Sequence, residues 1–408
     1  MNRWFYAVIG VIVLLLDGLV YAWSVMAKAI GASRSVWSQS QLSLTFTLVM
    51  IFFCIGCLIA GLLSKKVSPK IYVLGSGILF FVGFMIASMT GESIVTLYLG
   101  FGVLCGLAAG FAYNAVMSTM SLWFPDKQGL ISGILLMGFG ISSFIVGKVY
   151  AAVTPSDGSD QWHVTFRVIG IVIVVIMAVC SIFFVKPEAG YSPKGTDRSA
   201  AADRKVREPA LEAPTGTMVR MSSFWMYYAW AVLISAAGLA LVSQGSGIAS
   251  QVGKNASDGT IATVVGLISI FNGIGRVFFG ALFDKKGHRF TMVLDMIIFF
   301  AAAAILIAAI KSGSFALVIA GFIVGGFAYG GVTPTNSAII SDFFGRKNYP
   351  VNFSIINTNL IIASFASTIA GKLYDSSGSY MSTILMMVIV TAAGFAVSFG
   401  VIRPKSEA

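Results

Sequence analysis

The chain has 408 residues, of which 57% are hydrophobic and 11% are charged, and its formal net charge is +11. Soluble globular proteins carry about 25% charged residues, so this composition excludes a soluble protein and predicts one embedded in a lipid bilayer. The positive charge does not indicate nucleic-acid binding, because Lys and Arg gather in loops on one side of the apolar runs. Those runs are about 20 residues long, which predicts membrane-spanning α-helices; the strands of a membrane barrel span about ten residues.

Twelve membrane-spanning helices are predicted. In chain order they cover residues 5–31, 38–63, 71–90, 93–122, 129–153, 164–185, 222–250, 259–283, 290–310, 314–341, 350–374 and 379–402. The first run is longer than the core of a signal peptide and shows no cleavage site, so it is kept as a span. Most connections are short, except for residues 186–221, which are rich in proline and charge. This linker separates a first bundle of six helices, residues 1–185, from a second, residues 222–408.

The distribution of Lys and Arg predicts the orientation of the chain. Most of them fall at the two termini, in the linker and in loops on the same side of the spans, such as Lys285–Arg289. Cytoplasmic loops carry an excess of Lys and Arg. We therefore expect a multi-pass protein of the cytoplasmic (inner) membrane, with both termini in the cytoplasm.

The two halves contain an internal repeat. Ile55–Lys66 aligns without a gap on Ile274–Lys285, and Gly110-Phe-Ala-Tyr113 recurs as Gly326-Phe-Ala-Tyr329. Both copies lie in spans that run in the same direction. This pattern predicts two pseudo-symmetric bundles related by an axis along the membrane normal.

Two sets of motifs carry a resemblance to known families. Twelve spans in two halves resemble the major facilitator superfamily, as does the loop from Gly280 to Arg289, which matches its Gly-x-x-x-Asp-Arg/Lys-x-Gly-Arg/Lys-Arg/Lys motif. Gly18-Leu-Val-Tyr-Ala-Trp-Ser-Val25 and the stretch from Trp123 to Gly133 resemble the oxalate/formate antiporter family, which is related to monocarboxylate transporters. The superfamily resemblance implies that the loop latches helices between transport states. The loop residues so implicated are Asp284, Lys285, Gly287 and Arg289.

Arg276 is the candidate for substrate binding, because it is the only Lys or Arg deep inside an apolar run. It precedes Asp284 by eight residues, or roughly 12 Å of helix, and so lies near the middle of a bilayer core about 30 Å thick. A guanidinium there costs about 2.5–3.5 kcal/mol, and its planar fork can bind a carboxylate through two parallel hydrogen bonds. The family resemblance implies the same role for an arginine in span 8. The alternative is an internal ion pair or a packed arginine.

Several polar side chains are predicted near Arg276. Asn272 is one helical turn away and could orient the guanidinium, contact substrate or bond a neighbouring helix. Tyr113 and Tyr329 occupy matching places in spans 4 and 10, which predicts that they face each other across a central cavity; packing beside the repeated glycines is the alternative. Two further candidates for the cavity are Asn114 and Tyr21.

The remaining buried charges are acids. Asp17 lies within span 1, where a buried carboxyl can carry a proton near neutral pH. It is the candidate for proton coupling; the alternatives are an ion pair with Arg276 and a neutral, hydrogen-bonded acid. Asp295 and Asp342 are predicted near cytoplasmic helix ends, paired with basic residues. His163 and His288 are predicted to lie in loops, in contact with solvent.

No metal site, cofactor or enzymatic activity is predicted. The four cysteines, Cys54, Cys57, Cys105 and Cys180, lie in apolar runs without ligand partners. No nucleophile constellation is present, and the sequence lacks the P-loop that ATP-driven transport needs.

The sequence therefore predicts a monomeric secondary active transporter of small monocarboxylates such as lactate, pyruvate or formate. Proton symport by rocking of the two halves is the expected mechanism. The resemblance implies a lysine in span 11 of oxalate-type members, whereas Ile356-Asn-Thr-Asn-Leu360 has none, which favours one carboxylate over two. The alternatives are an oxalate/formate-type organic anion antiporter, and a membrane sensor or drug-efflux protein of the same fold.

Overall fold

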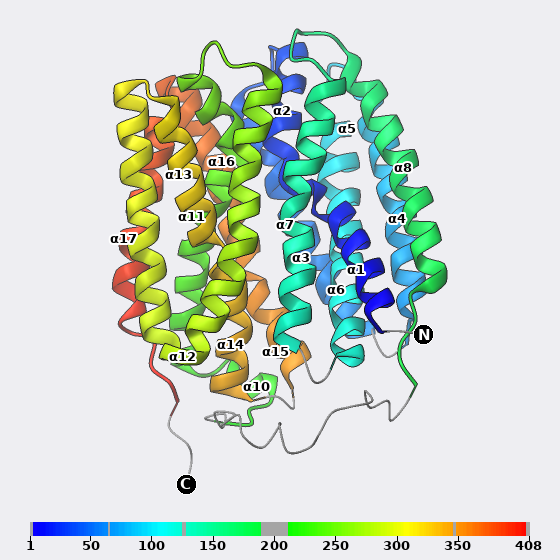
Figure 1. Ribbon diagram of the computed structural model, residues 1–408, viewed down its shortest axis with the longest axis vertical. Helices are drawn as coiled ribbons and strands as arrows, with labels where there is room; N and C mark the ends of the chain where they lie inside the picture. Colours follow the sequence, from blue (N-terminus) through cyan, green and yellow to red (C-terminus); the bar gives the residue numbers. More distant parts are fainter. Residues whose placement is uncertain (1–2, 64–65, 125–127, 189–210, 346–347, 405–408) are drawn as a thin grey trace.

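The computed structural model describes residues 3–63, 66–124, 128–188, 211–345 and 348–404. Over these residues the chain forms helices and no strands, and twelve of the helices are long and apolar enough to cross a membrane. The predicted all-α fold and its twelve spans are thus confirmed. Figure 1 shows the helices standing side by side, with the start of α1 and the end of α17 at the same end of the molecule. We call this end the terminal face and the opposite end the distal face.

The first half of the chain supplies six of the spans. Its elements are α1 (Arg3–Asp17), η1 (Gly18–Ala22), α2 (Trp23–Ser33), α3 (Gln39–Leu63), α4 (Pro69–Ala87), α5 (Val95–Leu97), η2 (Tyr98–Cys105), α6 (Gly106–Trp123), α7 (Gln128–Val153) and α8 (Gln161–Phe183).

The second half supplies the other six spans. Its elements are α10 (Thr215–Met218), α11 (Ser222–Val252), α12 (Asp258–Ser312), α13 (Phe315–Tyr329), α14 (Val332–Phe344), α15 (Tyr349–Asn357), α16 (Asn359–Ser377) and α17 (Met381–Ser398). The element α12 contains two spans, which turn at Gly287 with φ 77° and ψ 179°. Only glycine adopts this backbone conformation readily, which accounts for the glycine of the loop motif.

Four spans that the apolar runs predict as continuous depart locally from α-helical structure. Span 4 contains the π-helical segment η2. Span 1 passes through the 3₁₀ segment η1 directly after Asp17, span 10 breaks at Gly330 and Gly331, and span 11 breaks at Thr358. Pro334 contributes to the break in span 10, because it has no N–H to donate to the carbonyl of Gly330. The breaks place Tyr21 and Tyr329 in or beside irregular backbone.

Glycines bring helices into backbone contact at matching places in both halves. A Cβ on Gly110 would overlap the carbonyl oxygen of Phe53 in α3, and a Cβ on Gly326, its match in the repeat, would overlap that of Ile268 in α12. One turn further on, a Cβ on Gly330 would overlap the carbonyl oxygen of Asn272. Small residues permit this close approach in membrane proteins. In the second half the contact fixes the helix that carries Arg276 against the span that carries Tyr329.

Polar contacts join the two halves at the distal face. Lys28 Nζ lies 2.7 Å from Asp258 Oδ1, and the other oxygen of Asp258 accepts the N–H of Ser156 at 3.0 Å. Asp375 accepts the backbone N–H groups of Gln39 at 2.9 Å and of Ser40 at 3.0 Å, the first two residues of α3. Each contact crosses from one half to the other. We call these residues the distal latch: Lys28, Gln39, Ser40, Ser156, Asp258 and Asp375.

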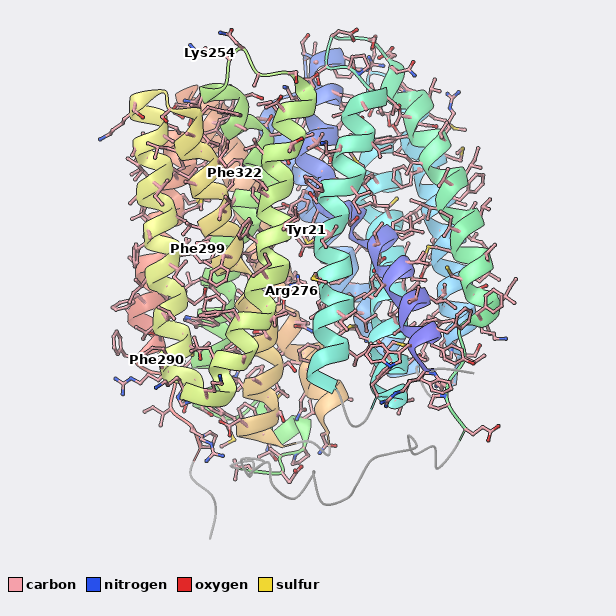
Figure 2. The ribbon with its side chains drawn as sticks, viewed as in Figure 1. Tyr21, Lys254, Arg276, Phe290, Phe299 and Phe322 are labelled. Carbon is pink, nitrogen blue, oxygen red and sulfur yellow. The ribbon has the colours of Figure 1, made fainter. Side chains whose placement is uncertain are left out.

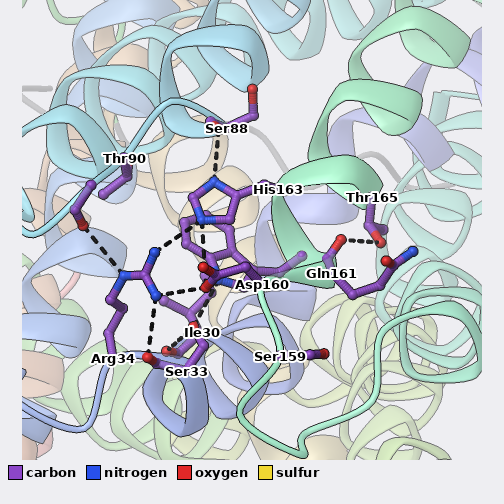
Figure 3. Close-up of polar contacts among 12 residues, drawn as sticks. Ile30, Ser33, Arg34, Ser88, Thr90, Ser159, Asp160, Gln161, His163 and Thr165 are labelled. Atoms are coloured by element: carbon purple, nitrogen blue, oxygen red, sulfur yellow. Dashed lines mark hydrogen bonds and ion pairs between the residues drawn. The ribbon is translucent and has the colours of Figure 1, made fainter.

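A second polar cluster ties the distal loops of the first half to one another (Figure 3). Arg34 donates to Asp160 Oδ1 at 2.6 Å and lies 3.2 Å from His163 Nε2, while His163 Nδ1 contacts the carbonyl of Ser88 at 2.7 Å. The hydrogen bond from Arg34 lowers the pKa of Asp160 below its ordinary value. The expectation of a solvated His163 was wrong: the residue is half-buried on α8, and its ring contacts Arg34 and the carbonyl of Ser88.

The end of the linker is bound to the second half at the terminal face. The N–H of Ala213 donates to the carbonyl of Phe344 at 3.0 Å, and Thr215 Oγ1 donates to Asn352 Oδ1 at 2.7 Å. Residues 189–210 of the predicted linker lie outside the described residues.

The loop motif lies at the same face. Lys285 and Arg289 are exposed, and the Arg289 guanidinium lies 5.5 Å from the ring of Phe399. The side chain of Asp284 lies outside the described part of the chain. His288 is half-buried in α12 with its ring 5.0 Å from that of Phe343, so the expectation that it is solvated was also wrong.

Candidate functional site

A small cavity lies between the two halves, about midway between the faces. Figure 2 shows Tyr21 and Arg276 at this level, between Lys254 near the distal face and Phe290 near the terminal face. The first half contributes Tyr21, Phe139 and Gly140 to its lining, and the second half contributes Val242, Ile268, Ser269, Asn272, Arg276 and Tyr329. Its volume is about 10 Å³, close to the least that holds one water molecule. A carboxylate therefore requires movement of side chains or helices to enter.

Arg276 is the only charged residue in the lining and is 8% exposed. Its Nε donates to Asn272 Oδ1 at 3.0 Å, and Nη1 contacts the carbonyl of Leu136 at 3.5 Å. Among the described residues no carboxylate forms an ion pair with it. A neutral amide orients the guanidinium without cancelling its charge, so the cavity carries an uncompensated positive charge.

Two tyrosines, one from each half, complete the polar part of the lining. The side chains of Tyr21 and Tyr329 both line the cavity and interact with each other, and both interact electrostatically with Arg276. Tyr21 belongs to the 3₁₀ segment of span 1, and Tyr329 is the last residue of α13 before the break. Helix interruptions in both halves thus border the same cavity.

Tyr113 and Asn114 lie outside the lining of this cavity. The Tyr113 ring packs 5.3 Å from Phe53 and 5.7 Å from Phe139, and of these three residues only Phe139 lines the cavity. The amide of Asn114 lies near Gly61 in α3. The repeated tyrosines are therefore not equivalent in this structure, because α6 continues through Tyr113 whereas α13 ends at Tyr329.

Asp17 is fully buried, and neither of its carboxyl oxygens has a hydrogen-bond partner among the described residues. It forms no ion pair with Arg276 in this structure. An unpaired carboxylate in such surroundings is strongly disfavoured. The surroundings therefore suit the protonated, neutral form.

Some lining residues were not predicted. Ser269 lies three residues before Asn272 and seven before Arg276 on the same helix, so helical spacing could have found it. Phe139 gives no such signal, because it is one apolar residue within an apolar span.

The polar side chains of Asn357 and Thr358 in span 11 form hydrogen bonds outside the cavity. Asn357 accepts from Asn336 at 3.3 Å, and the Thr358 hydroxyl lies 3.0 Å from that of Tyr228. All four residues belong to the second half, and none of them lines the cavity.

Comparison with known proteins gives matches along the whole chain. The family model described as "Major Facilitator Superfamily" matches residues 4–358 and 246–408. The oxalate:formate antiporter of Oxalobacter formigenes is 27% identical over 356 residues, covering 85% of this chain and 80% of that protein. Monocarboxylate transporter 12-B of Danio rerio is 22% identical over 380 residues, covering 85% of this chain and 76% of that protein.

The fold also has a solved counterpart. A bacterial homologue of the human lysosomal transporter Spinster, crystallised in an inward-facing and occupied conformation, superposes with a TM-score of 0.76 at 14% identity. The match covers 100% of this chain and 99% of that one.

Proposed function

Because this multi-pass membrane protein belongs to the Major Facilitator Superfamily, a family of transporters, we propose that it moves small monocarboxylates together with a proton. The observation that carries the proposal is the buried Arg276, whose charge is not paired in the described structure. The substrates that we propose are about the size of lactate, pyruvate and formate.

The chemistry of Arg276 selects for an anion with one carboxylate. Asn272 occupies Nε, and Nη1 has only a long contact at 3.5 Å, so the Nη groups remain available to a carboxylate. A second carboxylate would find no second cation among the lining residues. The printed names of two relatives, an oxalate:formate antiporter and a monocarboxylate transporter, support an organic acid as substrate.

The neighbouring groups have roles that complement this charge. Tyr21 and Tyr329 can donate to the bound carboxylate once their hydroxyls turn toward it, with Tyr113 and Asn114 joining the pocket in another state. Asp17 carries the proton, since its neutral form suits its surroundings. A carboxylate and a proton together add no net charge, so the membrane potential does not oppose their movement.

Access to the site alternates between the faces by rocking of the two halves. The distal latch is closed in this structure and must separate when the site opens to that face. The Lys and Arg distribution orients the terminal face toward the cytoplasm. The loop motif and the linker then lie in the cytoplasm. The linker joins the first six-helix bundle to the second. A single chain suffices for transport.

Uptake into proteoliposomes tests the proposal. Radiolabelled pyruvate, lactate and formate are supplied outside, with and without an inward proton gradient. Symport predicts uptake that rises with the gradient. The anion site predicts that Arg276→Ala loses uptake. The matched control Lys311→Ala, which removes an exposed cation at a helix end, should keep uptake near the wild-type level. Near wild-type uptake by Arg276→Ala would contradict the anion site. Uptake that requires an internal anion instead of the gradient would indicate exchange, the activity named for the Oxalobacter relative.

A further inference from the structure

Asp295 is a buried acid outside the cavity. It lies eight residues beyond the turn at Gly287, in the second span of α12, which places it about 12 Å along the helix from that turn. The sequence predicts that it pairs with a basic residue, and this prediction was wrong. Asp295 is 1% exposed, neither carboxyl oxygen has a hydrogen-bond partner among the described residues, and no described Lys or Arg forms an ion pair with it. By contrast, Asp342 pairs with Arg403 at 2.9 Å, as predicted.

The Asp295 carboxyl is packed against the break in span 10. A Cβ placed on Gly331 would lie 2.8 Å from Asp295 Oδ2 and 3.0 Å from the ring of Phe279. Gly331 directly precedes α14 and follows Tyr329 by two residues. The carboxyl therefore lies against the backbone two residues from a tyrosine that lines the cavity.

Polar side chains connect this region with the boundary between the halves. The Tyr227 hydroxyl donates to Asn336 Oδ1 at 2.6 Å, and Asn336 Nδ2 donates to Asn357 Oδ1 at 3.3 Å. The carbonyl of Asn357 accepts from Cys54 Sγ in the first half at 3.5 Å. Tyr227 also interacts electrostatically with Asp295. Three residues from packed elements face Asp295: Phe279 from the first span of α12, Gly331 from the break and Tyr227 from α11. Tyr227 is the one titratable group among them.

We propose that Asp295 is a proton-binding site, separate from the cavity, whose protonation state sets the position of Tyr329 and the affinity of the cavity for carboxylate. The neutral carboxyl is tolerated against Gly331 as the structure has it. The ionised form requires a donor, and Tyr227, which interacts electrostatically with Asp295, is the candidate that we take. The Tyr227 hydroxyl must then give up its hydrogen bond to Asn336. Asn336 and Asn357 can then rearrange at the boundary between the halves, and the backbone at Gly330 and Gly331 shifts with them. The effect on carboxylate affinity rests on the proposed function, whereas proton binding by Asp295 does not.

Infrared spectroscopy tests the proton site without any substrate. The carboxyl C=O stretch of the purified protein is followed as the pH is raised, in the wild type, in Asp295→Asn and in the matched control Asp157→Asn, an exposed acid of the distal face. Asp17, whose surroundings also suit the neutral form, contributes a second protonated-carboxyl band that all three proteins keep. Loss from Asp295→Asn of one titrating band that the wild type and the control both show supports the site. An unchanged band in Asp295→Asn overturns it.

Calorimetry with pyruvate then tests the coupling. We expect wild-type affinity to fall about 10-fold as Asp295 ionises, within the usual range of coupling between two sites. Asp295→Asn, which stays neutral, should keep the low-pH affinity at every pH, while Asp157→Asn should behave as the wild type. Wild-type pH dependence in Asp295→Asn overturns the coupling. If Asp295→Asn does not fold, Asp295→Glu should move the midpoint of the pH profile, and an unmoved midpoint overturns it. A wild type that binds no carboxylate refutes the proposed function, and the infrared titration still decides the proton site.

Discussion

Replacing Asp375 with alanine should shift the protein toward a state that is open at the distal face. The carboxylate accepts two backbone N–H groups, at 2.9 and 3.0 Å, at the start of α3 in the other half. It therefore acts as an N-terminal cap supplied across the boundary, and replacing a cap with alanine costs about 0.5–2 kcal/mol. Because Asp375 is exposed, we take about 1 kcal/mol, which shifts the equilibrium about 5-fold.

The salt bridge of the latch contributes less. Lys28 and Asp258 are 29% and 32% exposed in their side chains, and partly exposed pairs contribute at most about 1 kcal/mol. Lys28→Ala alone should therefore have a smaller effect than Asp375→Ala. The double variant should exceed either one, since the two contacts share no partner.

Spin labels on the distal face measure the shift. Cysteines at Glu92 and Lys254, exposed residues of the first and second halves, carry the labels, and the four native cysteines are buried. Double electron–electron resonance should show a larger long-distance population in Asp375→Ala than in the parent, and no change in the control Asp157→Ala. An unchanged distance distribution in Asp375→Ala would refute the idea that these bonds hold the distal face closed.

Three other substitutions test the packing and chemistry of the site. Gly330→Ala places a Cβ against the backbone of Asn272, so it should destabilise the protein by about 1–3 kcal/mol; thermal unfolding should show the loss, whereas Gly75→Ala, with nothing within 4 Å, should melt at or above the wild-type temperature. Tyr329→Phe removes one neutral hydrogen bond, about 0.5–1.5 kcal/mol, so calorimetry should find carboxylate affinity reduced at most about 10-fold, and a complete loss would assign the hydroxyl a larger role. Arg276→Lys keeps the charge but loses the fork; one charge-assisted bond of about 1.5–3 kcal/mol predicts affinity reduced about 10- to 150-fold, and full retention would argue against bidentate binding.

The fold could be predicted from the sequence because apolar run length and the repeated glycines determine it directly. The interruptions could not. Asp17-Gly18 and Gly330-Gly331 are tolerated within continuous membrane helices, and packing against neighbours decides whether such a pair breaks the helix. Tyr329 lines the cavity and Tyr113 does not, because span 10 breaks after Tyr329 whereas α6 continues through Tyr113. The sequence repeat alone predicts equivalent positions for the two side chains.

The site was predictable where a residue conflicts with its surroundings. Arg276 is a charge in an apolar run, and Asn272 follows from helical spacing. Phe139 matches its span and gives no signal. Asp295 was assigned a basic partner from its distance to a helix end, but that distance does not say which neighbours its face meets. The latch is equally hidden, since Lys28 and Asp258 are 230 residues apart in sequence.

The central claim is that Arg276 binds one carboxylate. Isothermal titration of the purified wild type and of Arg276→Ala, with pyruvate, lactate, formate and oxalate, tests it most directly. We predict that the wild type binds a monocarboxylate more tightly than oxalate, and that Arg276→Ala loses two charge-assisted hydrogen bonds, about 3–6 kcal/mol, or more than about 100-fold in affinity. Equal affinities for the wild type and Arg276→Ala would contradict the account.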